Sequence, residues 1–391
     1  MIVFTYPGQG SQKPGMGAPW TDHPSWELVI EAAEASGRDL EALLVRADAD
    51  ELKQTRNAQM ATYILSLVVL DAVSRVGADA AGHAGHSLGE YSALTAAGVI
   101  DFVDGVRLVG ERGDAMQAAA DEDPGTMAAV LGLDDGEVEI ACHRTADDVW
   151  VANYNAPGQV VIAGTADAVQ RAGEVAKELG AKRVMALPVG GAFHTPLMAA
   201  ARDRLRKAID GTEFRHPDGV VVANVDGAGH DVADDWPELL RAQLTSPVRW
   251  RQSLHTMADI GFTTFVELGP GTVLTGMTKR TISGARTLSV SSPDDIDHML
   301  EVLHGPLPGP VGQLEGEHLF ATERLVVSPS AGVFSPADGL AAGLSIETGD
   351  ILGQVGQVDV RSPFTGQLMG LLALDGERVG PREPIAWLRL G

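Results

Sequence analysis

Residues 85–91, Gly-His-Ser-Leu-Gly-Glu-Tyr, place a serine between two glycines with the spacing Gly-x-Ser-x-Gly. Glycines at Gly85 and Gly89 are typical of a backbone turn that is too tight for a β-carbon. A serine at the apex of such a strand-to-helix turn, here Ser87, exposes its hydroxyl for nucleophilic attack. The backbone N–H of the next residue, Leu88, is the expected first donor to an oxyanion. An ordinary tight turn is the alternative interpretation.

A nucleophilic serine also needs a second oxyanion donor and a general base. The loop Pro-Gly-Gln-Gly-Ser-Gln supplies a candidate donor, because Gly8 and Gly10 flank Gln9 and allow close approach of the chain. A tight loop without a ligand is the alternative here. Among the eleven histidines, His194 follows two glycines and precedes a Thr-Pro helix-start signal, so we expect it to be the base. A structural histidine remains the alternative, and His86, as part of the serine turn, should point away from the hydroxyl.

The composition limits the class of protein and its partners. The chain has 391 residues, 45% of them hydrophobic, and one cysteine, Cys142. These values predict a large core, two or three domains, no disulfide framework and a cytoplasmic location. No basic signal-peptide region follows Met1, and Asp71 interrupts the apolar stretch 61–73, which indicates a buried core helix. A net charge of −24 argues against nucleic acid or an anionic membrane as the main partner.

The order of predicted elements indicates the domain organisation. Strand-like and helical runs alternate through residue 304, which predicts an α/β domain. It includes a first strand over 2–6 and a helix over 58–76. Between about residues 125 and 190 the order becomes β-α-β-β-α-β, which is the ferredoxin-like unit, inserted here into the larger domain. Residues 305–312 are rich in proline and glycine and predict a linker to a second domain.

Seven motifs follow one another along residues 1–304: PGQGSQ, GHSLGEYSALTAAGVIDF, RLVGERGDAMQ, NYNAPGQVVIAG, FHTPLM, QLTSPVRW and VELGPGTVLTGMTKR. Together they resemble the malonyl-CoA–acyl carrier protein transacylase family. The resemblance implies an α/β-hydrolase-like core with a ferredoxin-like insert. It also implies transfer of a malonyl group from malonyl-CoA to the phosphopantetheine thiol of an acyl carrier protein, for fatty-acid or polyketide synthesis. The mechanism would be ping-pong, through a malonyl-Ser87 intermediate and without a metal or cofactor.

The same resemblance implies a role for each matching residue. Ser87 matches the family's nucleophile and His194 its general base. Gln9 and Leu88 match the two oxyanion donors. Arg112 matches the arginine that holds the free carboxylate of the malonyl group, a task suited to a planar guanidinium. Gln243 matches the residue whose backbone carbonyl orients the histidine. Gln59 and Asn155 match substrate-binding positions in the pocket, and Phe193 resembles the form associated with malonyl over bulkier methylmalonyl substrates.

Residues 313–391 carry an internal duplication. Two segments, beginning near residues 326 and 360, share a valine, Ser-Pro, two residues, a glycine, apolar residues and an acidic glycine turn. This pattern predicts a small all-β sandwich of two similar halves, and it resembles biotinyl/lipoyl carrier domains. Those domains carry a modified lysine in the hairpin joining the halves, but no lysine follows Lys279. We therefore expect no attached biotin or lipoate and a role in docking to other synthase components.

Two questions stay open at this level. The alternative function is a serine acyl-thioester hydrolase that clears wrongly loaded carrier proteins, although simple acyl groups would not need the clamp at Arg112. Carrier proteins are acidic, so docking is expected at local positive charge, either on residues 202–207 or at Lys279 and Arg280. A solvated helix face is the alternative for these cationic residues.

Overall fold

The computed structural model describes residues 1–145, 148–304, 323–337, 339–380 and 383–389. The chain divides into two compact units, Met1–Leu307 and Pro308–Gly391. The boundary between them falls within the predicted linker 305–312, which lies outside the described residues, as do residues 313–322.

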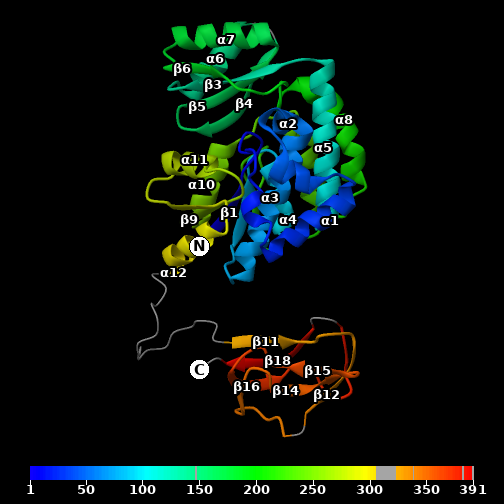
Figure 1. Cartoon of the computed structure of the whole chain (residues 1–391). Helices are drawn as coiled ribbons and strands as arrows, with labels where there is room; N and C mark the ends of the chain where they lie inside the picture. The colour runs from blue at the N-terminus through cyan, green and yellow to red at the C-terminus, as the bar shows by residue number, and fades with distance from the viewer. Residues whose placement is uncertain (146–147, 305–322, 338, 381–382, 390–391) are drawn as a thin grey trace. The chain divides into compact units, whose positions relative to one another are not determined.

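A six-stranded sheet forms the centre of the first unit, in the order β10-β9-β1-β2-β7-β8 (Figure 1). Its strands are parallel except for the final antiparallel pair, β7 with β8. The strands are β1 (Ile2–Tyr6), β2 (Gly82–Gly85), β7 (Val220–Val222), β8 (Gly229–His230), β9 (Thr264–Leu268) and β10 (Arg286–Val290). The predicted first strand, 2–6, therefore coincides with β1, and the elements confirm a mixed α/β structure.

Strand β2 has poor strand propensity, Gly-His-Ala-Gly, yet lies in the middle of this sheet. Close packing explains its glycines. A β-carbon on Gly82 would lie 2.6 Å from the ring of Phe262, and one on Gly85 would lie 1.8 Å from the backbone of Gly89. Residues 82–85 are a strand because β1 and β7 pair with them on both sides, although their own side chains do not favour strand formation.

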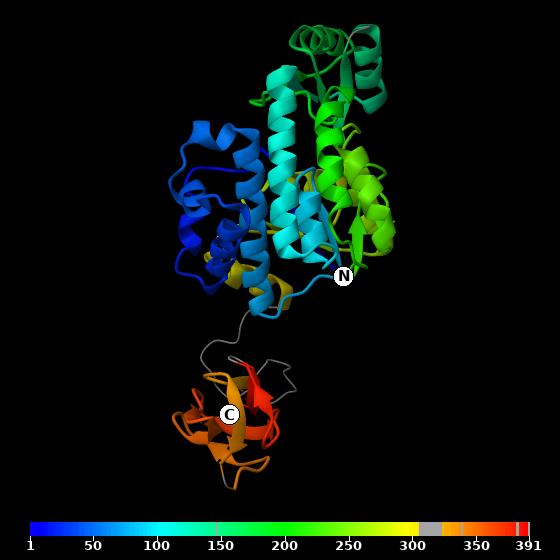
Figure 2. The ribbon, with the colours of Figure 1, turned by 90° about the vertical axis from the view of Figure 1, so that its right-hand side faces the viewer.

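Helices pack on the sheet, with the long α3 and α5 side by side (Figures 1 and 2). The helices and short helical turns outside the insert are η1 (Ala18–Trp20), η2 (Pro24–Trp26), α1 (Glu27–Ser36), η3 (Ala42–Arg46), α2 (Ala49–Lys53), α3 (Thr55–Arg75), α4 (Gly89–Ala96), α5 (Phe102–Glu122), η4 (Pro196–Met198), α8 (Ala199–Asp210), η5 (Ala233–Asp235), α9 (Trp236–Gln243), α10 (Trp250–Ile260), α11 (Val273–Thr281) and α12 (Asp294–His304). Within the described residues, α3 is the one helix long and apolar enough to cross a membrane, and 83% of its apolar window is buried inside the unit. That degree of burial is typical of a core helix.

The predicted insert has its own four-stranded antiparallel sheet, in the order β4-β5-β3-β6. Its elements are β3 (Thr126–Leu131), α6 (Asp135–Thr145), β4 (Val149–Ala156), β5 (Gln159–Gly164), α7 (Ala166–Glu178) and β6 (Arg183–Ala186). This is the predicted β-α-β-β-α-β order. Helices α6 and α7 pack on one face of the sheet around a separate apolar cluster (Figure 1).

The second unit consists of two four-stranded sheets, β11-β18-β16-β13 and β15-β14-β12-β17. Its strands are β11 (Glu323–Val327), β12 (Gly332–Pro336), β13 (Ser345–Ile346), β14 (Ile351–Val355), β15 (Val358–Arg361), β16 (Gly366–Leu371), β17 (Arg378–Val379) and β18 (Pro384–Arg389). Strands β11 to β14 form the first half and correspond, in order, to β15 to β18 in the second half. If each strand is replaced by its counterpart, the order of the first sheet becomes the order of the second. Ser328 and Ser362 occupy matching places, since each backbone N–H donates across to the other half at 2.8 Å. The duplication in the sequence is therefore also a duplication of strand pairing.

Candidate active site

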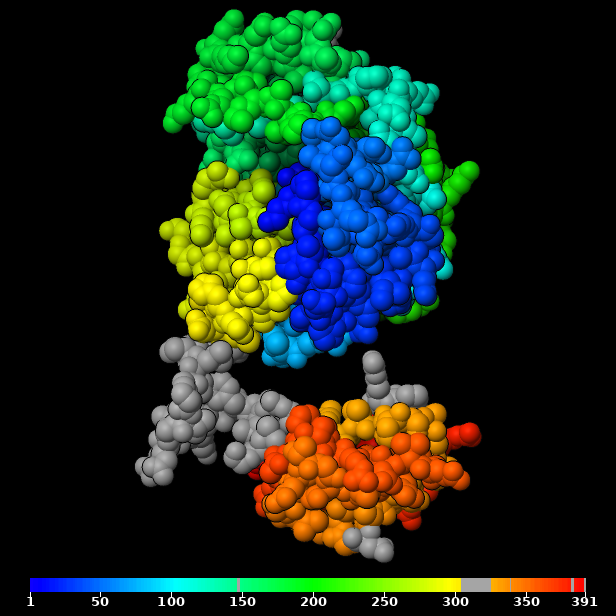
Figure 3. Space-filling model, in the orientation of Figure 1, coloured from blue at the N-terminus to red at the C-terminus, as the bar shows by residue number. Residues whose placement is uncertain are grey.

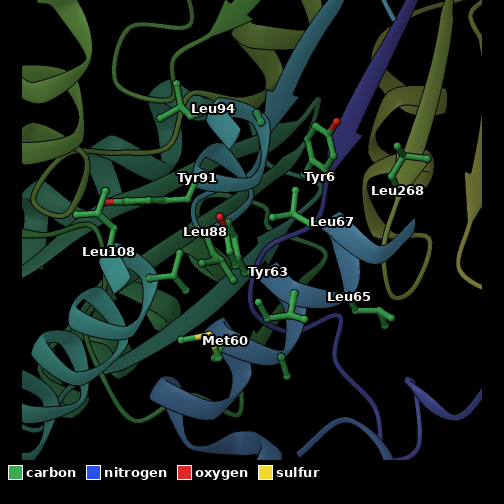
Figure 4. Close-up of a cluster of buried hydrophobic side chains, with 14 of the residues drawn as sticks. Tyr6, Met60, Tyr63, Leu65, Leu67, Leu88, Tyr91, Leu94, Leu108 and Leu268 are labelled. Atoms are coloured by element: carbon green, nitrogen blue, oxygen red, sulfur yellow. The ribbon is translucent and has the colours of Figure 1, made fainter. Parts of the chain in front are cut away.

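Ser87 lies at the turn between β2 and α4, with a backbone φ of +53°. A non-glycine residue rarely adopts this left-handed conformation, so the surrounding structure must enforce it. The turn crosses β1 closely, because a β-carbon on Gly89 would lie 2.0 Å from the carbonyl oxygen of Tyr6. Figure 4 shows Leu88 and Tyr91, just after the turn, in one buried cluster with side chains of α3. The residues that follow the strained serine are therefore anchored in the buried apolar core.

His194 lies within hydrogen-bond distance of the serine, with its Nε2 2.7 Å from Ser87 Oγ. Its Nδ1 is 2.8 Å from the backbone carbonyl oxygen of Gln243. A carbonyl can only accept, so Nδ1 carries the proton and Nε2 offers its lone pair to the serine hydroxyl. Burial, and then the positive charge of Arg112, lower the pKa of His194 to about 3. The histidine is therefore neutral near pH 7, as a general base must be.

The backbone of His194 is also strained, with φ of +61°. The helical turn η4 begins just after it, where Thr195 Oγ1 accepts a hydrogen bond from the N–H of Leu197 at 3.3 Å. The Thr-Pro pair is thus a helix start, as the sequence predicted. Only Ser87 and His194, among the described non-glycine residues, have positive φ, and they contact one another. Strain of this kind concentrates at functional sites.

Arg112 projects from α5 and is completely buried. Its Nη2 lies 3.1 Å from Ser87 Oγ and 3.0 Å from Gln243 Oε1, and its Nη1 lies 2.7 Å from Gln59 Oε1. The guanidinium carbon is 5.3 Å from the ring centre of Tyr91. These partners are all uncharged, and the Nε of Arg112 has no acceptor among the described residues. A buried cation without a bound carboxylate therefore lies directly beside the serine.

A cavity of about 240 Å³ opens onto Ser87 and His194. Its walls come from the loop after β1, the serine turn, α5, the insert and α11. Figure 3 shows the N-terminal segment (blue), the insert (green) and the segment that includes α11 (yellow) next to one another on one face. Three of the predicted substrate or oxyanion residues line it: Gln9, Asn155 and Phe193. Arg112 and Gln59 are not among its lining residues; both side chains are fully buried, and Gln59 Oε1 accepts a hydrogen bond from Arg112.

The two predicted oxyanion donors flank the serine. Gln9 lines the cavity, and Leu88 directly follows Ser87 at the start of α4. Within the described part of the chain, neither backbone N–H donates a hydrogen bond to another protein group. Two free N–H groups beside a nucleophile are the arrangement that stabilises an oxyanion.

Two further histidines near Ser87 in the sequence, His86 and His83, do not contact its hydroxyl. His86 Nε2 lies 2.8 Å from Asn155 Oδ1, so this histidine is tied to the cavity wall and not to the serine. His83 Nδ1 lies 3.0 Å from the hydroxyl of Tyr6 in the core beneath the turn. No group of His, Cys, Asp and Glu among the described residues is arranged to hold a metal ion.

Two residues that the sequence analysis missed support the serine turn. Asn224, just after β7, accepts a hydrogen bond from the N–H of Ser87 at 2.7 Å and donates to the carbonyl of Gly85 at 2.7 Å. Glu90, in the first turn of α4, is completely buried. The only sequence signal for Glu90 is an acidic residue in an otherwise uncharged helix, and Asn224 stands in no recognisable motif.

The predicted docking residues have partners of their own. Arg204 contacts Glu111 at 3.3 Å, and Arg206 contacts Asp210 at 3.8 Å, both in exposed ion pairs. These acids offset the local positive charge of α8. Elsewhere, Arg280 donates a hydrogen bond of 2.6 Å to the side chain of Gln159, which lines the cavity.

Comparison with known proteins places these features in a family. The model of the acyl transferase domain matches residues 3–294. A malonyl CoA-acyl carrier protein transacylase of Bacillus subtilis (strain 168) is 40% identical over 307 residues, covering 77% of this chain and 97% of that protein. The chain belongs to the malonyl CoA-acyl carrier protein transacylase family. The transacylase of Escherichia coli (strain K12) is 43% identical over 306 residues and is covered over 99% of its length.

Solved transacylase structures have the same fold as the first unit. A malonyl-transacylase in complex with its type II polyketide synthase acyl carrier protein aligns with a TM-score of 0.74 and 40% identity, covering 77% of this chain and 99% of that chain. The family match ends at residue 294, so the second unit lies outside it.

Proposed function

We propose that this chain transfers a malonyl group from malonyl-CoA to the phosphopantetheine thiol of an acyl carrier protein, through a malonyl-Ser87 intermediate. One observation carries the proposal: Ser87 Oγ lies 2.7 Å from a neutral histidine nitrogen and 3.1 Å from a buried guanidinium. The first group can activate the serine, and the second can hold a carboxylate on the acyl group. The pathway served is fatty-acid or polyketide synthesis.

The reaction runs in two half-reactions, which is ping-pong kinetics. His194 Nε2 takes the proton of Ser87 as Oγ attacks the thioester carbonyl carbon, and the N–H groups of Gln9 and Leu88 hold the resulting oxyanion. The carbon–sulfur bond then breaks, the coenzyme A sulfur takes the proton from His194, and malonyl-Ser87 remains. In the second half, His194 takes the proton of the carrier thiol, the sulfur attacks the ester, and Ser87 Oγ recovers the proton as it leaves. Gln243 holds His194 in the required tautomer throughout.

Arg112 selects the acyl group. Its hydrogen-bond partners within the protein are neutral oxygens, so its charge is available to a free carboxylate such as that of malonyl. Gln59 positions the guanidinium from behind. Phe193 and Asn155, on the cavity wall, limit the size of the group attached to the acyl chain. A hydrolase acting on simple acyl groups would have no use for this buried cation.

We also propose the finer assignments of fold and location. Residues 1–304 form an α/β-hydrolase-like acyltransferase domain with a ferredoxin-like insert at about 125–190, and residues 305–312 are the linker. The strand order β4-β5-β3-β6, with each neighbouring pair antiparallel, supports the assignment of the insert as ferredoxin-like. The enzyme works in the cytoplasm and uses neither a cofactor nor a metal.

Residues 313–391 are proposed to be a biotinyl/lipoyl-like β-sandwich that carries no biotin or lipoate and docks on other synthase components. The absence of any lysine after Lys279 removes the amine that attachment requires. The two sheets also differ at one matching pair of residues. The half-buried Trp387 pairs with exposed Leu325 on one sheet, whereas the matching pair on the other sheet is Gln354 with Asp359, joined by a hydrogen bond of 2.9 Å. The second sheet therefore shows that the fold does not need apolar residues at this position, which supports a docking role for the first sheet.

Mass spectrometry of the intact protein tests the proposed reaction. Incubation with malonyl-CoA should add one malonyl group, and a phosphopantetheinylated carrier protein should then remove it and gain the same mass. Ser87→Ala should abolish both steps. Label that survives in this variant would refute the assignment of the nucleophile, and loss of label to water without carrier loading would favour the hydrolase.

A further inference from the structure

Glu90 is a completely buried acid one helical turn from the nucleophile, and the reaction described above does not use it. One of its carboxyl oxygens accepts a hydrogen bond from the backbone N–H of Asn224 at 2.6 Å. The other accepts a hydrogen bond from Nε2 of Gln243. Both oxygens therefore face N–H donors, and a proton on either oxygen would have no acceptor in this arrangement. Burial raises the pKa of Glu90 to about 8, although these hydrogen bonds and the charge of Arg112 oppose the rise. The two N–H donors that face its oxygens match the ionised form, which is the form the positioning role uses.

Gln243 connects Glu90 to Ser87, His194 and Arg112. Its Nε2 also donates to the backbone carbonyl of Ser87 at 2.9 Å, and its Oε1 accepts from Nη2 of Arg112 at 3.0 Å. Its own backbone carbonyl binds His194. The side-chain amide thus has its nitrogen toward Glu90 and the serine, and its oxygen toward the arginine.

The side-chain amide of Gln243 has two orientations that exchange its oxygen and its NH₂ group, so its hydrogen-bond partners must select one of them. A carboxylate has acceptors only, and it therefore draws the NH₂ end of Gln243 toward itself. With the opposite orientation the NH₂ group would face the guanidinium, which also has donors only, and the oxygen would face the carbonyl of Ser87. Glu90 excludes that arrangement together with the Ser87 carbonyl and the guanidinium, and of these three groups it is the charged acceptor.

We propose that Glu90 is a positioning residue for acyl selectivity: it fixes the orientation of the Gln243 amide and thereby holds Arg112 where it binds the free carboxylate of the acyl group. The inference rests on the proposed function, in which Arg112 binds that carboxylate. Glu90 touches neither the substrate nor the reacting atoms. In its ionised form it also places negative charge near Arg112 without contacting the guanidinium, because the Gln243 amide lies between them.

Glu90→Gln is the sharpest test because it keeps the size and changes one acceptor into a donor. The new NH₂ group must face either the N–H of Asn224 or the NH₂ of Gln243. In the first case the serine turn loses a support; in the second the Gln243 amide turns and presents a donor to Arg112. We expect the ratio of kcat/KM for malonyl-CoA to that for acetyl-CoA to fall about tenfold or more, mainly through a higher KM for malonyl-CoA.

Acyl-enzyme formation on Ser87 is measured by quenched-flow mass spectrometry with both thioesters. The ratio does not depend on the fraction of folded enzyme, so partial unfolding cannot imitate the effect. Ser92→Ala is the matched control, because Ser92 lies on the same helix, is equally buried, and its hydroxyl has no partner in the described part of the chain. Its ratio should stay within twofold of the wild type.

Two further variants keep the test decisive. Glu90→Asp retains a carboxylate on a shorter side chain, so its ratio should fall less than that of Glu90→Gln. A ratio that falls in Glu90→Asp and stays at the wild-type value in Glu90→Gln would show that Glu90 only fills space. In a Gln243→Met background, Glu90→Gln should change the ratio less than twofold, because the connecting amide is already gone. An undiminished tenfold effect there, or equal losses with both thioesters in the single variant, would overturn the inference. A wild-type chain that is never acylated by malonyl-CoA would refute the proposed function itself.

Discussion

Replacing Arg112 by methionine should convert a malonyl-selective enzyme into one that discriminates poorly between malonyl and acetyl groups. Methionine keeps much of the length of the arginine side chain and removes its charge, so the packing around α5 changes little. The substitution removes the guanidinium that the proposed reaction assigns to the free carboxylate. It also removes one hydrogen bond to Ser87 Oγ.

The structure sets the expected size of the effect. Arg112 has no exposed surface, so a malonyl carboxylate bound beside it would lose its partner in a buried site. Leaving one member of a buried charge pair alone costs about 3–5 kcal/mol, which corresponds to about a 10²- to 10⁴-fold loss of kcat/KM for malonyl-CoA. Acetyl-CoA lacks the carboxylate and loses only the serine contact, worth about 1 kcal/mol or less than about tenfold in rate.

The same variant should change the pH dependence. The charge of Arg112 contributes, after burial, to the lowered pKa of His194. Its removal raises the pKa of His194, so the acid limb of kcat/KM for acetyl-CoA should move to higher pH. Quenched-flow mass spectrometry of acyl-Ser87 with both thioesters across a pH series measures both effects.

The control is Arg107→Met on the same helix, because Arg107 is exposed and pairs only with Asp104 at 3.1 Å in the described residues. It should leave both rates unchanged. Equal losses for malonyl-CoA and acetyl-CoA in Arg112→Met would show that the arginine supports the structure and does not bind the carboxylate. That result would refute the reasoning.

Three further outcomes are expected. Because the pKa of His194 is lowered to about 3, malonyl-Ser87 formation should keep its kcat/KM from neutral pH down to about pH 5, and an inflection near about 6.5, the ordinary histidine value, would contradict this. Changing Arg204 and Arg206 together to glutamate should raise the KM for carrier protein and leave that for malonyl-CoA, and an unaltered carrier KM in steady-state assays would exclude this part of α8 from docking. A chain ending at Leu307 should form malonyl-Ser87 at the full rate, so a folded truncation that is not acylated would show that the second unit contributes to the site.

The sequence was sufficient for the local features of this protein. Short-range patterns identified the first strand, the glycine-flanked serine turn, the Thr-Pro helix start after His194 and the order of elements in the insert. Each depends on residues a few positions apart, because glycine conformation and helix capping are local effects. The duplication of residues 313–391 was equally visible, since the two halves repeat the same turn residues.

The tertiary structure alone decided what surrounds the serine. Asn224 and Gln243 lie 137 and 156 residues from Ser87 along the chain. They contact it only because β7 pairs with β2 and because the fold brings the end of α9 to the serine turn. The tertiary structure also decided that Gln59 accepts a hydrogen bond from Arg112 and that Glu90, on a short helix, is completely buried. No local pattern encodes these contacts, because hydrogen bonding of a buried polar group depends on which distant segment the fold brings within 3 Å of it.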